Sequence, residues 1–312
     1  MNSFDKIILN GTDLVVDSSD IEVIKKYASS DVTTNPSLIL KNFNQFNVDE
    51  FISNLKLEDI LVKIGLKISK HVNGLISTEV NPSLSYDTEN TVRTARKIIK
   101  LYEENGLNRD RILIKIAATW EGIKAAEILE KEGIKCNMTL VLSFFQAVYC
   151  AKVGATLISP FVGRITDWYK NNGYDVKTIK RDFGVKNVLN INKYFEEMGY
   201  KTIVMAASFR SIDQIKALSG ISKITVSPNL LEELKNDSSD INSLVPNFKF
   251  EEHLKNQIID FSKEEFEKNS SDSKVVKEKL DEGINTFIKD TNKLMENLLK
   301  KKIKIEKSTS NQ

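Results

Sequence analysis

Short apolar runs alternate along the chain with longer stretches in which apolar residues recur every three or four positions. The longer stretches have helical spacing, as in Val92, Ala95, Ile99 and Tyr102. The short runs have the length of buried strands, and they fall at residues 14–16, 32–34, 75–78, 112–117, 134–139, 156–159, 202–206 and 223–226. This order predicts parallel strands joined by helices.

Glycines stand where the helical stretches should stop, directly ahead of five of the strand-like runs. These are Gly106, Gly133, Gly154, Gly199 and Gly220. The chain has 312 residues, no Pro/Gly-rich linker and neither a GxGxxG nor a phosphate-loop motif that would favour an open sheet. Eight strand–helix units in one core therefore predict a single closed (β/α)8 barrel domain over residues 1–312, in the α/β class.

The pattern changes after Val226. A helix-like segment at 230–235 and a polar stretch at 236–240 precede a long amphipathic segment. Its apolar residues are Val276, Leu280, Ile284, Phe287, Leu294 and Leu298. We expect residues 229–300 to form helices packed on the barrel, and residues 301–312 to form a flexible, solvated tail.

The net charge and the cysteine content limit the kinds of partner and the cellular compartment that we expect for this chain. The 45 basic and 43 acidic side chains leave a net charge of +2, so no broad positive field favours nucleic acid or an anionic membrane. No run is long enough to cross a bilayer, and the start lacks the pattern of a signal peptide. Cys136 and Cys150 have neither disulfide-framework nor ligand spacing, which is typical of a reducing compartment. We expect a cytoplasmic protein.

Lys115 is the exceptional residue of the strand-like runs, because it is an amine inside the apolar sequence ILIKIA. On a strand it shares a face with Leu113 and Ala117 and points where barrel-filling groups point. Loss of hydration favours the neutral amine, a nucleophile for carbonyl carbon. Taken alone, the segment fits a snorkelling or ion-paired lysine at a strand end better than it fits a reactive, buried amine.

Polar residues at the other strand ends change that balance. In a barrel of this kind, the reactive groups come from the carboxyl ends of the strands and the loops that follow. Any single polar residue at a strand end could be a helix cap or a solvated group, but nearly every strand-like run ends in a polar residue. The residues are Asp17, Asn35, Glu79, Lys115, Asn137, Thr139, Ser159, Ser208 and Arg210.

Several separated motifs carry a family resemblance. The segments VTTNPSLIL, ILIKIAATWEGIKAAEILEKEGIKCNMTLVLSFFQA, LISPFVGRITDWY and VMAASFR resemble those of transaldolases, and the match spans about Asp13 to about Leu298. The family forms a lysine Schiff base in a (β/α)8 barrel. The resemblance implies transfer of a dihydroxyacetone unit from sedoheptulose 7-phosphate to glyceraldehyde 3-phosphate, giving erythrose 4-phosphate and fructose 6-phosphate in the pentose phosphate pathway. It is also compatible with a homodimer.

The same resemblance implies the catalytic roles. Lys115 matches the Schiff-base lysine, and Asp17 matches the carboxylate that takes and returns the proton of the C4 hydroxyl. Glu79 and Thr139 match the pair that holds a water for proton shuttling. The implied partners are sugar phosphates, with no cofactor and no metal.

The implied binding residues follow the same motifs. Asn35, Asn137 and Ser159 match the groups that hydrogen-bond the three-carbon fragment, and Phe161 walls the pocket. Those assigned to phosphate are Arg164, Ser208 and Arg210. Two arginines and a hydroxyl also suit a phosphate on chemical grounds, the alternative being surface ion pairs. The loop at 81–85 departs from the family, which commonly has a charged trio there.

Three alternatives compete with transaldolase. A fructose-6-phosphate aldolase would release free dihydroxyacetone, but such enzymes resemble a shorter form without the C-terminal helices. A zinc-dependent aldolase is disfavoured because His71 and His253 are the only histidines and neither stands beside a second plausible ligand. A catalytically dead binding barrel predicts loss of Lys115 or Asp17, and both are present.

Overall fold

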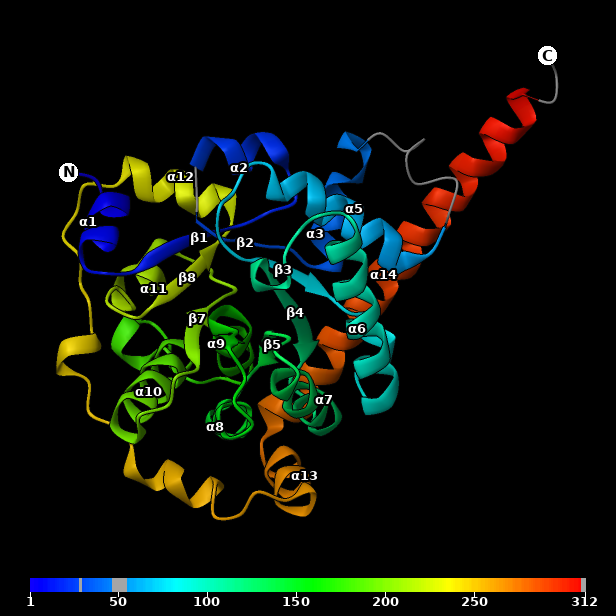
Figure 1. Cartoon of the computed structure of the whole chain (residues 1–312). Helices are drawn as coiled ribbons and strands as arrows, with labels where there is room; N and C mark the ends of the chain where they lie inside the picture. The colour runs from blue at the N-terminus through cyan, green and yellow to red at the C-terminus, as the bar shows by residue number, and fades with distance from the viewer. Residues whose placement is uncertain (28–29, 47–54, 310–312) are drawn as a thin grey trace.

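The computed structural model describes residues 1–27, 30–46 and 55–309. Its strands pair in parallel and in chain order, and the first pairs with the last, which closes an eight-stranded barrel (Figure 1). The predicted (β/α)8 barrel with additional C-terminal helices is therefore confirmed. The strands are β1 (Asp13–Asp17), β2 (Val32–Thr33), β3 (Ile76–Glu79), β4 (Ile112–Ala117), β5 (Cys136–Val141), β6 (Leu157–Pro160), β7 (Ile203–Ala206) and β8 (Lys223–Val226).

Helices surround the barrel and follow the strands. They are α1 (Ser3–Leu9), α2 (Ile21–Tyr27), α3 (Pro36–Asn42), α5 (Leu57–Ser69), α6 (Thr88–Glu104), α7 (Trp120–Lys131), α8 (Phe144–Lys152), α9 (Val162–Asn171), α10 (Phe183–Met198), α11 (Ile212–Ala217), α12 (Pro228–Asn236), α13 (Lys263–Asp272) and α14 (Lys274–Thr309), with a 3-10 turn η2 (Pro82–Leu84) after β3. Most start at a side-chain cap of the kind that satisfies free backbone N–H groups, such as Thr119 ahead of α7. Gly199 ends α10 in the left-handed conformation, as expected for a stop glycine.

The barrel interior is layered. Val15, Leu113, Leu157 and Met205, from four different strands, form an apolar cluster inside the barrel. Lys115 lies two residues beyond Leu113 on β4 and therefore on the same face, one layer nearer the carboxyl ends. The strand register pairs Lys115 with Glu79 on one side and with Asn137 on the other, so three neighbouring strands bring polar side chains together at this level.

Strand β5 differs from its sequence prediction. It runs to Val141 rather than stopping at Thr139, and its register against β6 shifts between Met138 and Val141. Leu140 adopts φ 56° within this irregularity. Among the described residues, Leu140 and Ser208 are the non-glycine residues with positive φ, and each follows a predicted site residue or is one. Left-handed backbone at bulky residues is uncommon and concentrates at functional sites.

Helix α14 packs on α3, α9, α13 and η2, and its apolar stripe lies in the same core as the barrel helices. The helix continues to Thr309, so most of the segment expected to be a tail is helical, and residues 310–312 lie outside the described part. Its C-terminal end extends beyond the barrel (Figure 1). None of the helices in the described ranges combines the length and apolar character needed to cross a membrane.

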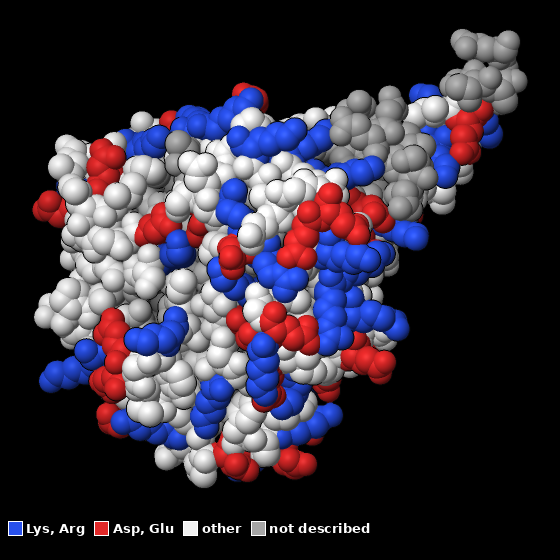
Figure 2. Space-filling view, in the orientation of Figure 1, with Lys and Arg blue, Asp and Glu red and all other residues white. Residues whose placement is uncertain are grey.

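Basic and acidic side chains are interspersed on the face of the molecule drawn in Figure 2. This distribution agrees with the near balance of 45 basic and 43 acidic residues in the chain. Any strong attraction for an anion must therefore come from a local group of side chains.

Candidate active site

A cavity of about 220 Å³ opens at the carboxyl ends of the strands. Its lining is Asp17, Thr33, Asn35, Ser37, Leu38, Lys115, Ser159, Phe161, Arg164, Ala207, Ser208, Thr225 and Phe287. Seven of the eleven predicted site residues therefore line one cavity, although they come from five separate stretches of the chain. Glu79 contacts Lys115 directly, whereas Asn137 and Thr139 occupy neighbouring strand positions and Arg210 lies at the rim beside Ser208.

Lys115 is 4% exposed, and its amine reaches the cavity. Nζ donates a hydrogen bond of 2.9 Å to the carbonyl oxygen of Thr34 and lies 3.5 Å from Glu79 Oε2. The register of β3 and β4 pairs Glu79 with Lys115, which explains this ion pair. The lysine is thus neither snorkelling nor solvated, and its nitrogen is held at the edge of an open space that can admit a carbonyl compound.

Asp17 shares the cavity with Lys115. Its Oδ1 accepts a hydrogen bond of 2.8 Å from Thr33 Oγ1, and the two residues pair in the register of β1 and β2. Burial raises the pKa of Asp17 above its ordinary value, and the positive charge of Lys115 and the hydrogen bond from Thr33 only partly offset this. A carboxylate with a raised pKa is a better proton acceptor than an ordinary aspartate, which suits a general base.

Glu79 and Thr139 lie on the strands that flank β4. Burial raises the pKa of Glu79, with Lys115 as the main opposing influence. Glu79 Oε2 and Thr139 Oγ1 are buried and have no hydrogen-bond partner among the described protein groups. Buried polar atoms of this kind are rare, and each needs a partner such as an ordered water. The pair therefore fits the water-holding role that the family resemblance implies.

Asn137 and Ser159 form a buried hydrogen-bonded chain. Asn137 Nδ2 donates to Ser77 Oγ over 3.0 Å, and Ser159 Oγ donates to Asn137 Oδ1 over 2.8 Å. A linked network of this kind fixes each side chain, so Ser159 presents its hydroxyl to the cavity in one orientation. Asn35 lines the cavity too, and its Oδ1 caps α3 by accepting from the backbone N–H of Leu38. The helix-cap alternative is thus realised for Asn35 without removing it from the site.

Arg164 enters the cavity from the first turn of α9. Its guanidinium lies 5.2 Å from the ring centre of Phe161 and 5.6 Å from that of Phe287, so the two aromatic rings clamp it. Within the described ranges it has no hydrogen-bond or ion-pair partner. A half-buried guanidinium with unused donors is a strong site for an anionic oxygen group.

Arg210 has a different environment. Its Nε and Nη2 lie 2.9 Å and 2.8 Å from Asp167 Oδ2, and its Nη1 lies 3.5 Å from Ser208 Oγ. The ion-pair alternative is therefore realised on one edge of the guanidinium, while the other edge remains beside the cavity-lining Ser208.

Three residues that line the cavity, Thr33, Thr225 and Phe287, are not predicted as site residues from the sequence. Thr33 and Thr225 contact each other beneath Asp17, but in sequence they read as strand formers. In the sequence, the one indication that Thr33 and Thr225 belong to the site is that neighbouring strand-like runs also end in polar residues. The apolar stripe that contains Phe287 predicts only a helix packed on the barrel. Such a stripe shows which face of a helix is buried and not what lies against it.

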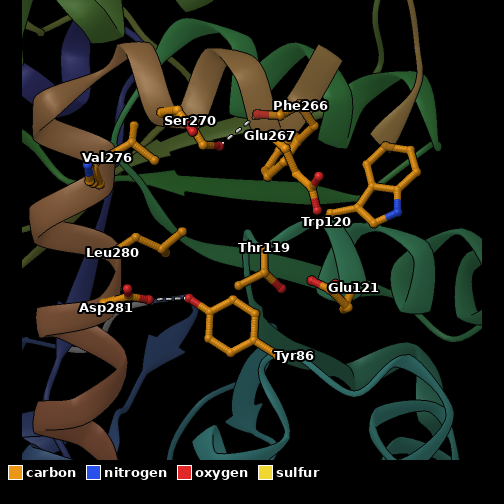
Figure 3. Close-up of a pocket in the computed structure, with 12 residues that line it drawn as sticks. Tyr86, Thr119, Trp120, Glu121, Phe266, Glu267, Ser270, Val276, Leu280 and Asp281 are labelled. Carbon is orange, nitrogen blue, oxygen red and sulfur yellow. Dashed lines mark hydrogen bonds between the residues drawn. The ribbon is translucent and has the colours of Figure 1, made fainter. Parts of the chain in front are cut away.

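A larger cavity of about 430 Å³ lies between Tyr86, the start of α7, α13 and α14, and none of the predicted site residues lines it (Figure 3). Tyr86 points across it and donates a hydrogen bond to Asp281 of α14. Elsewhere in the part of the chain described by the structure, no group of three or more His, Cys, Asp or Glu side chains forms a metal site.

A closed (β/α)8 barrel with one lysine and two carboxyl groups around a cavity at its carboxyl end defines an enzyme that uses an amine to process carbonyl compounds. Residues 14–298 match the family model described as transaldolase/fructose-6-phosphate aldolase, and the chain belongs to this family.

Curated relatives share this assignment over nearly their whole length. The transaldolase of Methylobacillus flagellatus is 46% identical, over 96% of this chain and 99% of the relative. The transaldolase of Histophilus somni (strain 129Pt) is 47% identical, over 94% and 97%. The transaldolase of Marinomonas sp. is 46% identical, over 92% and 95%. The similarity therefore includes the C-terminal helices as well as the barrel.

Proposed function

We propose that this chain is a transaldolase of the pentose phosphate pathway. It transfers a dihydroxyacetone unit from sedoheptulose 7-phosphate to glyceraldehyde 3-phosphate, giving erythrose 4-phosphate and fructose 6-phosphate. The observation that carries the proposal is the buried amine of Lys115 facing a cavity that it shares with Asp17. Release of free dihydroxyacetone is not favoured, because the relatives at 43–47% identity are named transaldolases.

Lys115 acts as the nucleophile. Its neutral amine adds to the C2 carbonyl of the donor, and loss of water from the carbinolamine gives a protonated imine. That dehydration moves protons between nitrogen and oxygen. Glu79 and Thr139 hold the water that carries them, which agrees with the two buried oxygens that lack a hydrogen bond.

Asp17 acts as the general base. It takes the proton of the C4 hydroxyl, the C3–C4 bond breaks, and the electron pair moves into the imine to leave an enamine on Lys115. The departing aldehyde is replaced by the acceptor aldehyde. The enamine then attacks the new carbonyl carbon, Asp17 returns the proton to the new hydroxyl, and hydrolysis of the imine frees Lys115.

The remaining residues bind and orient the substrate. Asn35, Asn137 and Ser159 hydrogen-bond the three-carbon fragment, and Phe161 limits access of water to the enamine. The phosphate group of donor and acceptor is bound by Arg164, Ser208 and Arg210. Because the phosphate and the imine are held at separate points, the reacting carbons are fixed between them.

Sugar phosphates are accordingly the proposed partners, and the cytoplasm is the proposed compartment. The cytoplasmic location is supported by the free, buried thiols of Cys136 and Cys150. We also propose a homodimer, for which the exposed apolar residues near the end of α14 give a physical argument developed below.

A pair of assays separates the proposed reaction from that of its nearest rival. With sedoheptulose 7-phosphate and glyceraldehyde 3-phosphate, the chain should form erythrose 4-phosphate and fructose 6-phosphate. With fructose 6-phosphate alone, it should release little free dihydroxyacetone. Dihydroxyacetone release at a rate equal to transfer would contradict the proposal.

Reductive trapping tests the roles of Lys115 and Asp17. Borohydride added with fructose 6-phosphate should attach a three-carbon adduct to Lys115, detected by mass spectrometry of the tryptic peptide. Asp17→Asn should instead trap the intact six-carbon sugar phosphate, because the imine forms but the C3–C4 bond does not break. Lys115→Ala should give no adduct and lose nearly all activity. An adduct at another lysine would refute the mechanism.

A further inference from the structure

Arg164 and Arg210 are held in different ways. Arg164 lines the site cavity, whereas Arg210 lines the neighbouring surface cavity and reaches the rim of the site cavity beside Ser208. Arg164 is clamped by aromatic rings and has no polar partner among the described residues. Arg210 is half-exposed, and both Nε and Nη2 contact one carboxylate oxygen of Asp167. The first arginine thus has no hydrogen bond or ion pair that occupies its donors, whereas the second has one edge committed to a neighbour.

The surroundings of Arg210 fix its backbone and leave its side chain dependent on Asp167. The backbone N–H of Arg210 donates to Gln214 Oε1 over 2.8 Å, and Gln214 is itself buried and bonded to Asp182. The guanidinium lies on Gly163 in the first turn of α9, where a Cβ would come within 2.8 Å of Nη1. Apart from weak contacts of Nη1 near 3.4–3.5 Å, Asp167 supplies the polar contacts of this guanidinium.

We propose that Asp167 is a positioning residue for phosphate recognition, which it achieves through Arg210. Its carboxylate holds the Nε and Nη2 edge of Arg210, so that Nη1 stays beside Ser208 at the rim of the cavity. The inference rests on the proposed function, because it takes the phosphate of the substrate as the ligand of Arg210.

The physical reason is the flexibility of a free arginine. An arginine at a solvent-exposed rim samples many rotamers, and ordering it on binding costs affinity. Asp167 imposes that order before the substrate arrives. The five donors of a guanidinium permit this, because a carboxylate on one edge leaves the donors of Nη1 for a phosphate. Arg164 has no ion-pair partner among the described residues, so it supplies donors and positive charge for the dianion even though Arg210 is paired with Asp167.

The test compares phosphorylated and unphosphorylated donors. With D-glyceraldehyde as the common acceptor, the ratio of kcat/KM for fructose 6-phosphate to that for fructose measures phosphate recognition. Asp167→Asn should lower this ratio about two- to fivefold, the range expected for a half-exposed ion pair, through KM rather than kcat. Asp167→Glu should restore part of the loss, because it returns a carboxylate to the same turn of α9.

A matched control is present near the same site. Asp175 forms a half-exposed ion pair with Arg181, and it lines the same surface cavity as Asp167 and Arg210. Its carboxylate pairs with Arg181 rather than with Arg210. Asp175→Asn should leave the ratio unchanged. Thermal unfolding of both variants reports whether either substitution disturbs the fold instead.

A double-mutant cycle separates positioning from a general structural effect. Arg210→Ala alone should lower the ratio by about tenfold or more, and Asp167→Asn should then add nothing when combined with Arg210→Ala. An equal loss with and without Arg210 would overturn the inference, as would a gain in the ratio, which would make Asp167 a competitor of the substrate. If Arg210→Ala leaves the ratio unchanged, the inference fails with the phosphate role of Arg210. The Lys115 adduct would still form in that case, which distinguishes it from failure of the proposed function.

Discussion

Asp17 and Glu79 place two carboxyl groups around one lysine, and burial raises the pKa of both. A folded-state pKa above the unfolded value means that the group favours the folded state when protonated. That contribution is complete below the unfolded pKa and is lost as the pH rises through the folded-state pKa. At neutral pH the site therefore costs stability, as is common where groups are arranged for chemistry rather than for packing.

We predict that Asp17→Asn stabilises the protein at neutral pH, by about 1 kcal/mol in the free energy of unfolding. The amide oxygen of asparagine can still accept the hydrogen bond from Thr33, so only the buried charge is removed. The gain should shrink as the pH falls through the raised folded-state pKa of Asp17, and it should be smallest below the pKa of an unfolded aspartate, where the carboxyl is neutral in both states. Urea unfolding at several pH values measures this difference.

Asp240→Asn is a suitable control for that experiment, since Asp240 is fully exposed. Its effect on stability should be small at every pH. A loss of stability in Asp17→Asn at neutral pH would mean that the attraction between Asp17 and Lys115 outweighs the cost of burying the carboxylate.

At the scale of elements, α14 forms part of the site as well as its cover. Phe287 lines the cavity, and a Cβ on Gly283 would lie 2.7 Å from Arg164 Nη1 and 2.8 Å from a methyl group of Leu140. Hydrogen bonds hold the helix in place from three directions, with Ser37 and Tyr86 bonded to its aspartates and Trp168 to Glu278. A Cβ at position 283 would therefore displace the ends of the Arg164 and Leu140 side chains.

We predict that Gly283→Ala weakens binding of phosphorylated donors and destabilises the fold. Alanine in place of glycine within a helix usually stabilises by about 0.5–1 kcal/mol, so a loss of stability would identify the contact with Arg164 and Leu140 as the cause. KM for fructose 6-phosphate and the thermal midpoint are the measurements. Asn285→Ala, at an exposed position of the same helix, should leave both nearly unchanged. A stabilised Gly283→Ala with normal KM would contradict the prediction.

The elements also show where sequence patterns stop being informative. Apolar periodicity located all eight strands, because strands buried on both faces leave continuous apolar runs. It did not show the irregular end of β5, since Leu140 in a left-handed conformation has no compositional signature. Nor did it assign Thr33 to Asp17, because that contact depends on the pairing of two strands 16 positions apart. For Arg210, the sequence leaves phosphate binding and an ion pair open; the structure shows the ion pair with Asp167, and phosphate binding stays a prediction.

At the scale of the whole molecule, the end of α14 carries apolar side chains into solvent. Leu299, Ile303 and Ile305 are 50%, 43% and 37% exposed, on a helix end that extends beyond the barrel (Figure 1). Exposed apolar residues grouped on a projecting helix often mark a contact with another chain.

We predict that the chain is a homodimer at micromolar concentration and that α14 takes part in the contact. Light scattering coupled to gel filtration measures the mass, and Leu299→Lys should shift it toward the monomer by placing a charge in an apolar contact. Lys289→Ala, on an exposed face of α14 within the barrel region, is the control and should leave the mass unchanged. A monomeric unsubstituted chain would refute the prediction.

The placement of Gly283 and Phe287 has a consequence for biosynthesis. Helix α14 completes the cavity wall around Arg164. A chain emerging from the ribosome can therefore pair all of its strands before the cavity is complete. Lys115 and Asp17 would by then already be in place. Competence for catalysis thus depends on α14, and a premature stop codon before position 283 should yield a barrel that has Lys115 but lacks the part of the cavity wall that α14 supplies.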